Sequence, residues 1–188
     1  GLEELMVKNM DHLYFTTDYK KAYVDADVII IAVGTPEKRD GSANLAYVFG
    51  VASQIAASIS KECVVIVKST VPIGTNDEVE RLLNENPLEL RVHVASNPEF
   101  LAQGTAVPDT MHASRIVLGV NDDFAREKLL EMYQNFDAPI MVCNRRSAEM
   151  IKYASNDFLA LKISYMNEIA NLCEAIGANV EEVAKGMG

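Results

Sequence analysis

The chain has 188 residues, of which 49% are hydrophobic and 23% charged, and its formal net charge is −10 at pH 7. This is the composition of a globular protein with one substantial core, and its acidic balance repels nucleic-acid phosphates, so no nucleic-acid partner is expected. The longest apolar runs are too short to cross a bilayer and the start lacks a signal-peptide layout, so we expect a cytoplasmic protein.

Cysteine and histidine spacing gives no indication of a metal site. The cysteines lie far apart without CxxC or metal-like spacing, and their odd number argues against a disulfide framework: Cys63, Cys143 and Cys173. The histidines are not clustered and none has a partner at metal-ligand spacing, so we interpret all of them as structural or exposed: His12, His93 and His112.

After a short amphipathic opening, apolar β-branched runs alternate with segments of helical character. The runs are ADVIIIAV (26–33), CVVIVKS (63–69), RVHVAS (91–96), RIVLGV (115–120) and IMVC (140–143). Such short continuous runs are typical of strands covered on both faces. The helical segments between them are 45–59, 76–84 and 122–136, and Asp122 and Asp123 mark the start of the last one. This alternation predicts an α/β fold, a doubly wound parallel (Rossmann-like) sheet, in which ligands bind beyond the carboxyl ends of the strands.

Three loops at those predicted carboxyl ends place a proline beside Gly, Ser, Thr or Asn. They are VGTPEKRDGS (33–42), STVPIGT (69–75) and SNPEFLAQGTA (96–106). Stiff turns of this kind expose hydroxyls and backbone N–H groups. Ordinary turn chemistry would explain any one of these loops, but three of them on one sheet edge favour a ligand site.

The last segment is a predicted long helix. From Ser147 to about Ile176 there is no Pro or Gly; Ser147 can cap the start, and Gly177 can end the helix in the left-handed conformation. About 30 residues would give a length of about 45 Å. Its apolar residues cover more than one stripe, which indicates contact with a second domain or a second subunit. We therefore divide the chain into residues 1–146 and 147–188.

Some polar residues could carry chemistry, although each has an ordinary explanation. Lys152 and Asn156 lie four apart on one helix face, where a lysine can transfer a proton or stabilise an oxyanion, but a solvent-facing pair is commoner. Glu99 could act as a general base, order a water or bind a sugar hydroxyl, or instead cap a short helix starting at Phe100. Thr70 could hold a water or touch a cofactor, but turn hydroxyls commonly bond to their own backbone.

Long motifs in a fixed order carry a resemblance to a known family. They are IAVGTP (31–36), VKSTVPIGT (67–75), SNPEFLAQGTAVPDTMHASRIVLG (96–119) and MIKYASNDFLALKISYMNEIANLCEAIGANVEEV (150–183). Together they resemble the nucleotide-sugar dehydrogenases of the UDP-glucose/GDP-mannose dehydrogenase family. The resemblance implies oxidation of the C6 alcohol of UDP-glucose to UDP-glucuronate with two NAD⁺ per turnover, a step of polysaccharide biosynthesis. It also implies that the long helix connects two domains and builds a homodimer.

The resemblance further implies roles for loop and helix residues. The sugar would be bordered by Glu99, Phe100, Leu101, Ala102 and Gln103. Lys152 and Asn156 would face its C6 end, and Thr70 with Glu99 would position the water of the second half-reaction. The NAD side would be lined by Val33, Gly34, Thr35, Pro36, Ser69, Thr70 and Val71. Many relatives have Glu in place of Gln103, whose neutral amide can still hydrogen-bond to a ribose hydroxyl.

Two family features are not found in this sequence. The Gly-rich dinucleotide-binding turn would precede Gly1, and the loop with the catalytic cysteine would follow Gly188. None of the cysteines present lies in the context of that nucleophile. We therefore expect this chain to be a fragment that is inactive by itself, because the pyrophosphate-binding turn and the nucleophile are missing.

Alternative functions follow from the same motifs. A GDP-mannose dehydrogenase would share the NPEFL loop and the same lysine, although HASRIVLG looks more like the UDP-glucose branch. A hydroxyacid or 6-phosphogluconate type of dehydrogenase would fit ADVIIIAVGTP but would leave SNPEFLAQGTA unexplained. A non-catalytic dimerising α/β module would use the long helix, but would not need the polar residues of the loops to converge.

Overall fold

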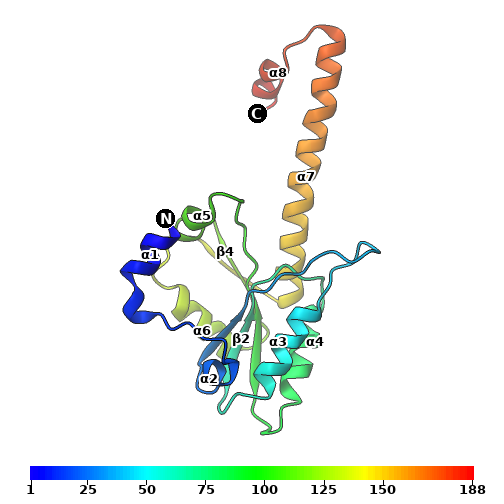
Figure 1. The fold of residues 1–188 in the computed structure, drawn as a ribbon. Coiled ribbons are helices and arrows are strands. Elements are labelled where there is room, and N and C mark those ends of the chain that lie inside the picture. Colours follow the sequence, from blue (N-terminus) through cyan, green and yellow to red (C-terminus); the bar gives the residue numbers. More distant parts are fainter. The chain divides into compact units, whose positions relative to one another are not determined.

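The computed structural model describes residues 1–188, which form two compact units, Gly1–Met150 and Ile151–Gly188. The first unit contains a sheet with helices on both faces, and the second contains helices only (Figure 1). The boundary that we predict between residues 146 and 147 is a boundary between domains, which is a different kind of division from these compact units, and it stays a prediction.

The sheet has five strands in the order of the sequence: β1 (Val28–Ile31), β2 (Cys63–Val67), β3 (Val92–Ser96), β4 (Ile116–Gly119) and β5 (Ile140–Cys143). β1, β2 and β3 are parallel, and so are β4 and β5, which confirms the predicted α/β fold. The prediction of a wholly parallel sheet is wrong at one place, because β3 and β4 are antiparallel and pair only through Ser96 and Gly119. The connection between them carries only the short helix α5 (Ala106–Met111), whereas a parallel crossover usually needs a helix packed on the sheet.

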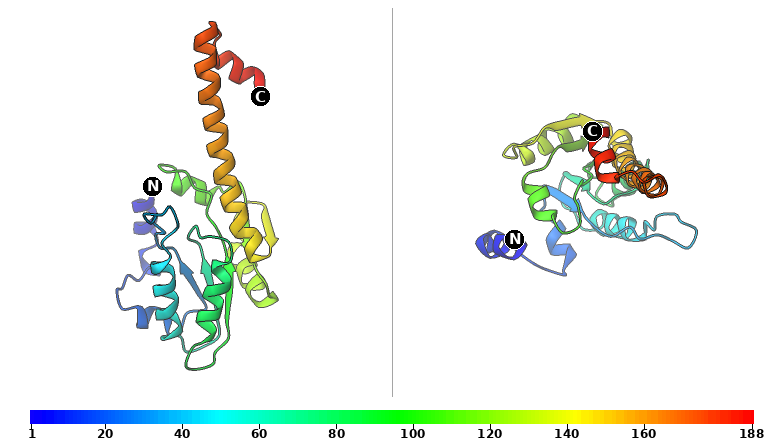
Figure 2. Two further views of the ribbon diagram at one scale, coloured as in Figure 1. Left: turned by 90° about the vertical axis from the view of Figure 1, so that its right-hand side faces the viewer. Right: turned by 90° about the horizontal axis from the view of Figure 1, so that it is seen from above.

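Both faces of the sheet are covered, as the continuous apolar runs predict. Helices α3 (Ala46–Ala56) and α4 (Thr75–Asn84) pack on one face, and α6 (Asp123–Tyr133) packs on the other (Figure 2). Side chains of β2 alternate between the two cores, with Val65 and Val67 in the first and Val64 and Ile66 in the second. Every residue of β2 and β3 is therefore buried, and this rigid centre holds the loops at the strand ends.

Helix ends show how local chemistry sets the elements. Asp122 accepts a hydrogen bond from the Ala125 N–H at 2.9 Å and caps α6, as its position predicts. Helix α7 (Arg145–Ile176) begins before Ser147, so the prediction that Ser147 caps it is wrong. Asn144 is the cap, because its side chain accepts from the Ser147 N–H at 2.8 Å.

The start of the first unit consists of short helices with no buried residues: α1 (Leu2–Lys8), the 3₁₀ helix η1 (Met10–His12) and α2 (Tyr19–Tyr23). Asp18 caps α2 by accepting from the Lys21 N–H. Tyr23, at the end of α2, is partly buried and packs against the first core. The segment before β1 therefore contributes to the edge of the core and not to its centre.

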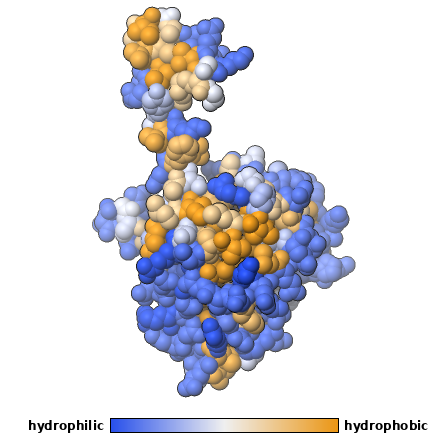
Figure 3. Space-filling view, turned by 180° about the vertical axis from the view of Figure 1, so that it is seen from behind, coloured by the Kyte–Doolittle hydropathy of each residue, from blue (hydrophilic) through white to orange (hydrophobic).

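The second unit consists of most of α7 and the whole of α8 (Val180–Met187). Helix α8 folds back beside the end of α7 (Figure 1). Gly177 has φ +74°, which confirms the predicted left-handed end of α7, and Asn179 caps α8. The surface of this unit mixes apolar and hydrophilic residues (Figure 3). Exposed apolar side chains of α7 within this unit are Phe158, Leu159, Leu161, Ile163, Tyr165, Leu172 and Ile176. None of the helices combines the length and the apolar character that a membrane crossing requires.

Candidate functional site

The loops after β1 and β2 are joined by side-chain hydroxyls. Ser69 Oγ accepts from the Val33 N–H at 2.9 Å and donates to the Val33 carbonyl at 2.7 Å. Thr35 Oγ1 donates to the Thr70 carbonyl at 2.9 Å. Because β1 and β2 are parallel neighbours, their carboxyl ends meet at one sheet edge, and the structure brings together four residues predicted for the cofactor side.

A hollow of about 420 Å³ lies beside these loops, between the end of β1 and α3, and it is lined by Val33 and Gly34 together with Ala46, Tyr47, Gly50, Val51 and Gln54. Gly34 and Gly50 leave open space where a Cβ atom would stand, so a flat ring can approach the backbone there. Pro36 is exposed in the same loop, whereas the Val71 side chain belongs to the core and only its backbone is available to a ligand.

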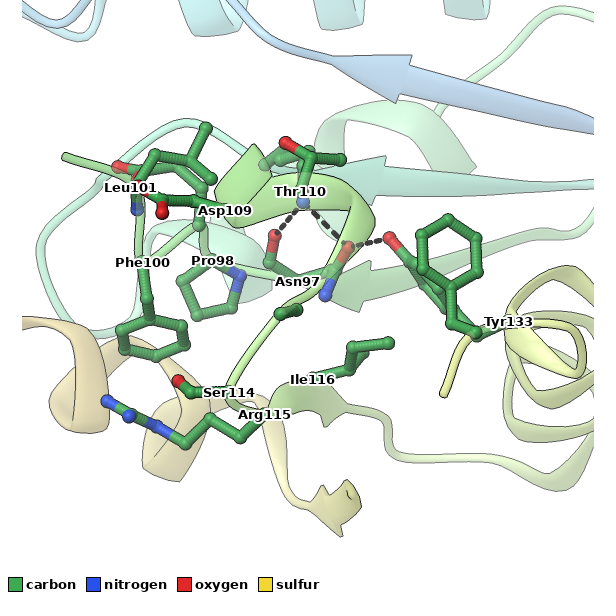
Figure 4. A pocket seen from close by; sticks show the side chains of 14 residues that line it. Asn97, Pro98, Phe100, Leu101, Asp109, Thr110, Ser114, Arg115, Ile116 and Tyr133 are labelled. Carbon is green, nitrogen blue, oxygen red and sulfur yellow. Dashed lines mark hydrogen bonds between the residues drawn. The ribbon is translucent and has the colours of Figure 1, made fainter. Parts of the chain in front are cut away.

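A pocket of about 150 Å³ lies behind the loop that follows β3 (Figure 4). Of the residues predicted to border a sugar, Glu99, Phe100 and Leu101 line it. Ala102 and Gln103 are exposed and do not line it. The rest of the wall comes from the end of β2, α5, the start of β4 and the end of α6, so elements far apart in the sequence close around this loop.

Asn97 anchors the loop from inside, with 2% of its surface exposed. Its side-chain Nδ2 donates to the Val117 carbonyl at 2.9 Å, and its Oδ1 accepts from Lys68 Nζ at 3.1 Å. The same Oδ1 accepts from the Tyr133 hydroxyl (Figure 4). Burial raises the pKa of Tyr133, so this hydroxyl stays a donor at neutral pH. One amide thus connects the ends of β2 and β3 with β4 and α6. Sequence reasoning missed these residues; an Asn between a buried strand and a proline was the available signal.

Two carboxylates hold the backbone of the same loop. Glu99 Oε2 accepts from the Leu101 N–H at 2.7 Å, and Asp109 Oδ2 accepts from the Ala102 N–H at 2.9 Å and from the Thr105 hydroxyl at 2.7 Å. The bonds from Ala102 and Thr105 lower the pKa of Asp109. The suggestion that Glu99 caps a helix starting at Phe100 is wrong, since the first helix after β3 is α5.

Arg115 is a further residue that sequence reasoning missed. Its guanidinium carbon lies 4.0 Å from the centroid of the Phe100 ring, and both side chains line the pocket (Figure 4). A guanidinium over an aromatic face is attractive, by about 0.5–1 kcal/mol at exposed sites and more where water is excluded. The contact fixes the ring of Phe100 between the loop and the start of β4.

Lys152 and Asn156 lie on α7, in the second unit, whereas Thr70 and Glu99 belong to the first unit. Lys152 and Asn156 both lie within a helix, as the sequence predicts. The convergence of these four residues on one substrate stays a prediction.

The histidines have the structural or exposed positions predicted for them. His93 is 4% exposed and lies between two carboxylates, with Nδ1 2.8 Å from Asp122 and Nε2 2.8 Å from Glu62. His12 and His112 are exposed. No group of three or more His, Cys, Asp or Glu side chains could hold a metal ion.

Hydroxyls and backbone N–H groups at the carboxyl edge of a mostly parallel α/β sheet, beside a hollow open to a flat ring, define the class of dinucleotide-binding domains. The chain belongs to the UDP-glucose/GDP-mannose dehydrogenase family. Residues 1–137 match the NAD binding domain of that family, and residues 146–188 match its central domain.

Relatives match over the whole chain. It is 52% identical to UDP-glucose 6-dehydrogenase YwqF of Bacillus subtilis, covering 100% of this chain and 43% of the relative, and 48% identical to the UDP-glucose 6-dehydrogenase of Rhizobium meliloti, covering 100% and 45%. Among solved structures, a UDP-glucose dehydrogenase from Pyrobaculum islandicum superposes with a TM-score of 0.96 at 41% identity, covering 100% of this chain and 45% of that one. A GDP-mannose dehydrogenase from Pseudomonas aeruginosa gives 0.93 at 36% identity, covering 98% and 44%. The chain therefore spans less than half the length of these proteins.

Proposed function

We propose that this chain is part of an NAD-dependent enzyme that oxidises the C6 hydroxyl of UDP-glucose to the carboxylate of UDP-glucuronate. The reaction consumes one water and reduces two NAD⁺ for each sugar, releasing two NADH and three protons. The observation that carries the proposal is the 52% identity to a UDP-glucose 6-dehydrogenase over the whole chain. The hydroxyl-linked loops and the hollow beside Gly34 support it, because they suit a nicotinamide dinucleotide.

The cofactor would lie along the loops after β1 and β2, held by Val33, Gly34, Thr35, Pro36, Ser69, Thr70 and the backbone of Val71, with Gln103 reaching a ribose hydroxyl. Bound there, NAD⁺ would supply the acceptor for the hydride that leaves C6. The support from this chain is that the Ser69 and Thr35 hydroxyls each bond to the neighbouring loop, so both loops are held in place before a ligand arrives.

The sugar would lie against the loop after β3, bordered by Glu99, Phe100, Leu101, Ala102 and Gln103. Lys152 would stabilise negative charge that develops on the C6 oxygen, and Asn156 would hold that oxygen in place. Glu99 and Thr70 would orient the water that enters in the second half-reaction. The anchoring of the loop by Asn97 supports this assignment, because a carboxylate can orient a water only if its own backbone is fixed.

A homodimer formed through α7 is part of the same proposal. It is supported by the row of exposed apolar side chains on this helix, which would be costly to leave in water. A cytoplasmic location and a role in polysaccharide biosynthesis belong to the proposal through the resemblance alone.

The test uses the full-length protein with NAD⁺ and either UDP-glucose or GDP-mannose, followed by absorbance of NADH. We expect NADH with UDP-glucose at two equivalents per sugar, and little with GDP-mannose. NADH with GDP-mannose only, or one equivalent with UDP-glucose, would contradict the proposal. Residues 1–188 alone serve as the control and should produce none, because the chain has no Gly-rich turn to bind the pyrophosphate.

A further inference from the structure

Glu149 is a buried carboxylate to which the proposed chemistry gives no role. It is 2% exposed, and both of its oxygens accept hydrogen bonds. Oε2 accepts from the Gly74 N–H at 2.6 Å, and Oε1 accepts from the Asn76 N–H at 2.9 Å and from Asn76 Nδ2 at 2.6 Å. All three partners are donors. Only a carboxylate offers acceptors on both sides, because an amide in its place would direct N–H hydrogens at one of the donors.

These donors belong to the start of α4, where the helix leaves its first N–H groups without partners in the helix. The cap position is Gly74, with φ +94°, which has no side chain to accept from them. Glu149 supplies the missing acceptor from a position 75 residues further along the chain. Its negative charge also lies at the positive end of the helix dipole.

Arg145 makes a second connection between the same two helices. It is 3% exposed, and its Nη2 lies 2.9 Å from Asp77 and 2.6 Å from Glu80, both on α4. The neighbouring Arg146 contacts Asp77 at 2.8 Å. Helix α4 and the start of α7 are therefore joined by ion pairs, in which the buried guanidinium of Arg145 faces two partly exposed carboxylates. Removing either carboxylate would leave the buried charge of Arg145 with fewer partners, which is destabilising.

The loop that carries Thr70 ends where this junction begins. Thr75 Oγ1 donates to the Pro72 carbonyl at 2.6 Å and ties the loop to the first turn of α4. The other end of the loop is held by Ser69, which bonds to Val33. Thr70 therefore lies on a short segment with both ends fixed, and Glu149 fixes the end nearer to α7.

We propose that Glu149 is a positioning residue: its carboxylate fixes loop 69–75 against the first turn of α7, the helix that continues to Lys152, and so holds Thr70 in its working place. The inference rests on the proposed function, in which Thr70 orients water and Lys152 acts on the C6 oxygen. Glu149 itself touches neither substrate nor cofactor in this scheme.

The test compares the E149Q, T70A and E149Q/T70A variants of the full-length protein, with E85Q as the matched control. Glu85 is an exposed carboxylate at the far end of α4, so its neutralisation should leave kcat unchanged. We expect E149Q to lower kcat by about 10- to 100-fold with little change in KM for UDP-glucose, because a displacement of about 1 Å in a catalytic group costs this much. In the T70A background E149Q should add less than about threefold, because the two residues act through one loop.

A rescue and an activity-independent measurement complete the test. In E149Q/N76D the carboxylate introduced on α4 can accept from the amide introduced on α7, so part of kcat should return. Hydrogen exchange of the 69–80 segment should become faster in E149Q and stay unchanged in E85Q, which can be measured without any substrate. If E149Q does not fold, N76A removes one of the three donors and should show the same effects at roughly fivefold in kcat.

The outcomes separate the two proposals. Wild-type protein without activity toward UDP-glucose would contradict the proposed function, whereas exchange in segment 69–80 would still report on the junction. A damaged T70A variant beside an E149Q variant with full kcat and unchanged exchange would overturn the inference alone. Effects of E149Q and T70A that multiply in full would overturn it too, because they would show that Glu149 acts independently of the loop.

Discussion

At the scale of single residues, Asn97 is predicted to contribute strongly to the stability of the first unit. Its amide is buried and bonds to groups of three other segments, so N97A would leave the Val117 carbonyl without its donor and remove an acceptor from Lys68 and Tyr133. We expect a loss of about 2–4 kcal/mol in the free energy of unfolding, measured by urea denaturation. The control is N9A, which removes an exposed amide bonded to the Leu5 carbonyl and should change stability by less than about 0.5 kcal/mol. Equal effects of the two substitutions would contradict the role of Asn97.

Lys152 and Glu99 carry the prediction about activity. In the full-length protein we expect K152M and E99Q each to lower kcat with UDP-glucose by about 10²- to 10⁴-fold, the usual contribution of a positioned acid, base or charge. K162M and E37Q make the same chemical changes at exposed positions of α7 and of the loop after β1, and should stay within about twofold of wild type. Activity that survives in K152M, measured by NADH formation, would remove Lys152 from the site.

Asp122 carries a prediction about pH. Burial tends to raise the pKa of its carboxyl, but the hydrogen bonds from the Ala125 N–H and from His93 outweigh burial and lower the pKa below its ordinary 3.8. A carboxyl whose pKa is lower in the folded state stabilises the fold above its unfolded pKa, and that stabilisation disappears as the pH falls through the folded value. Wild-type protein should therefore lose more stability than D122N between about pH 5 and about pH 3 in urea titrations. D123N, at the exposed neighbouring carboxylate, should follow the wild type.

Which residues the sequence could predict depends on how far apart along the chain the interacting residues lie. The loop residues Ser69, Thr70 and Glu99 could be proposed for the site because turn chemistry is local and the motif resembles a family. The residues that could not be found have partners far along the chain, and no spacing rule connects them: Asn97, Lys68, Tyr133, Arg115 and Glu149. The bond from Gly74 to Glu149 crosses 75 residues, and that from Tyr133 to Asn97 crosses 36.

At the scale of elements, the close packing of β4 against the start of α7 depends on Gly119. A Cβ atom there would lie 2.5 Å from Ala148 Cβ and 2.9 Å from Arg145 Cα, so either the strand or the helix would have to move. We expect G119A to cost about 1–3 kcal/mol in urea denaturation, or more, since overpacking against backbone relaxes poorly. G50A is the control with the opposite sign, because Gly50 lies inside α3 with open space around it and an alanine should stabilise the helix by up to about 1 kcal/mol.

Elements were predictable where one local signal decided them. The apolar β-branched runs identified the strands, and Asp122 and Gly177 marked helix ends correctly, since these signals lie within a few residues. The reversal between β3 and β4 was not predictable from periodicity, because a strand has the same pattern in both directions. The start of α7 was misassigned because Ser147 and Asn144 both suit a cap, and the structure uses the asparagine.

At the scale of the whole molecule, this chain corresponds to less than half of the relatives that it matches, so complete activity is a matter for the full-length protein. In the proposed function the sheet contributes hydroxyls, backbone donors and a fixed carboxylate, while the long helix contributes an ammonium and an amide. A 32-residue helix is about 48 Å long, more than a single small sheet can cover. Its exposed apolar side chains are therefore the proposed dimer contact. If α7 forms the dimer, sedimentation of a full-length L161E/I163E double variant should show monomers in place of dimers.

The single residue pair between Ser96 and Gly119 divides the hydrogen bonding of the sheet into two blocks, one of three strands and one of two. Inside each block, backbone pairing runs along the whole strand. Between the blocks, the hydrogen bond from the Asn97 side chain to the Val117 carbonyl adds to the single backbone pair. Subglobal opening should begin along this line, with the amides of 116–143 exchanging as one foldon before those of β2 and β3. The part of the pocket wall formed by β4 and α6 would then open more often than the loops after β1 and β2, where the cofactor is proposed to bind.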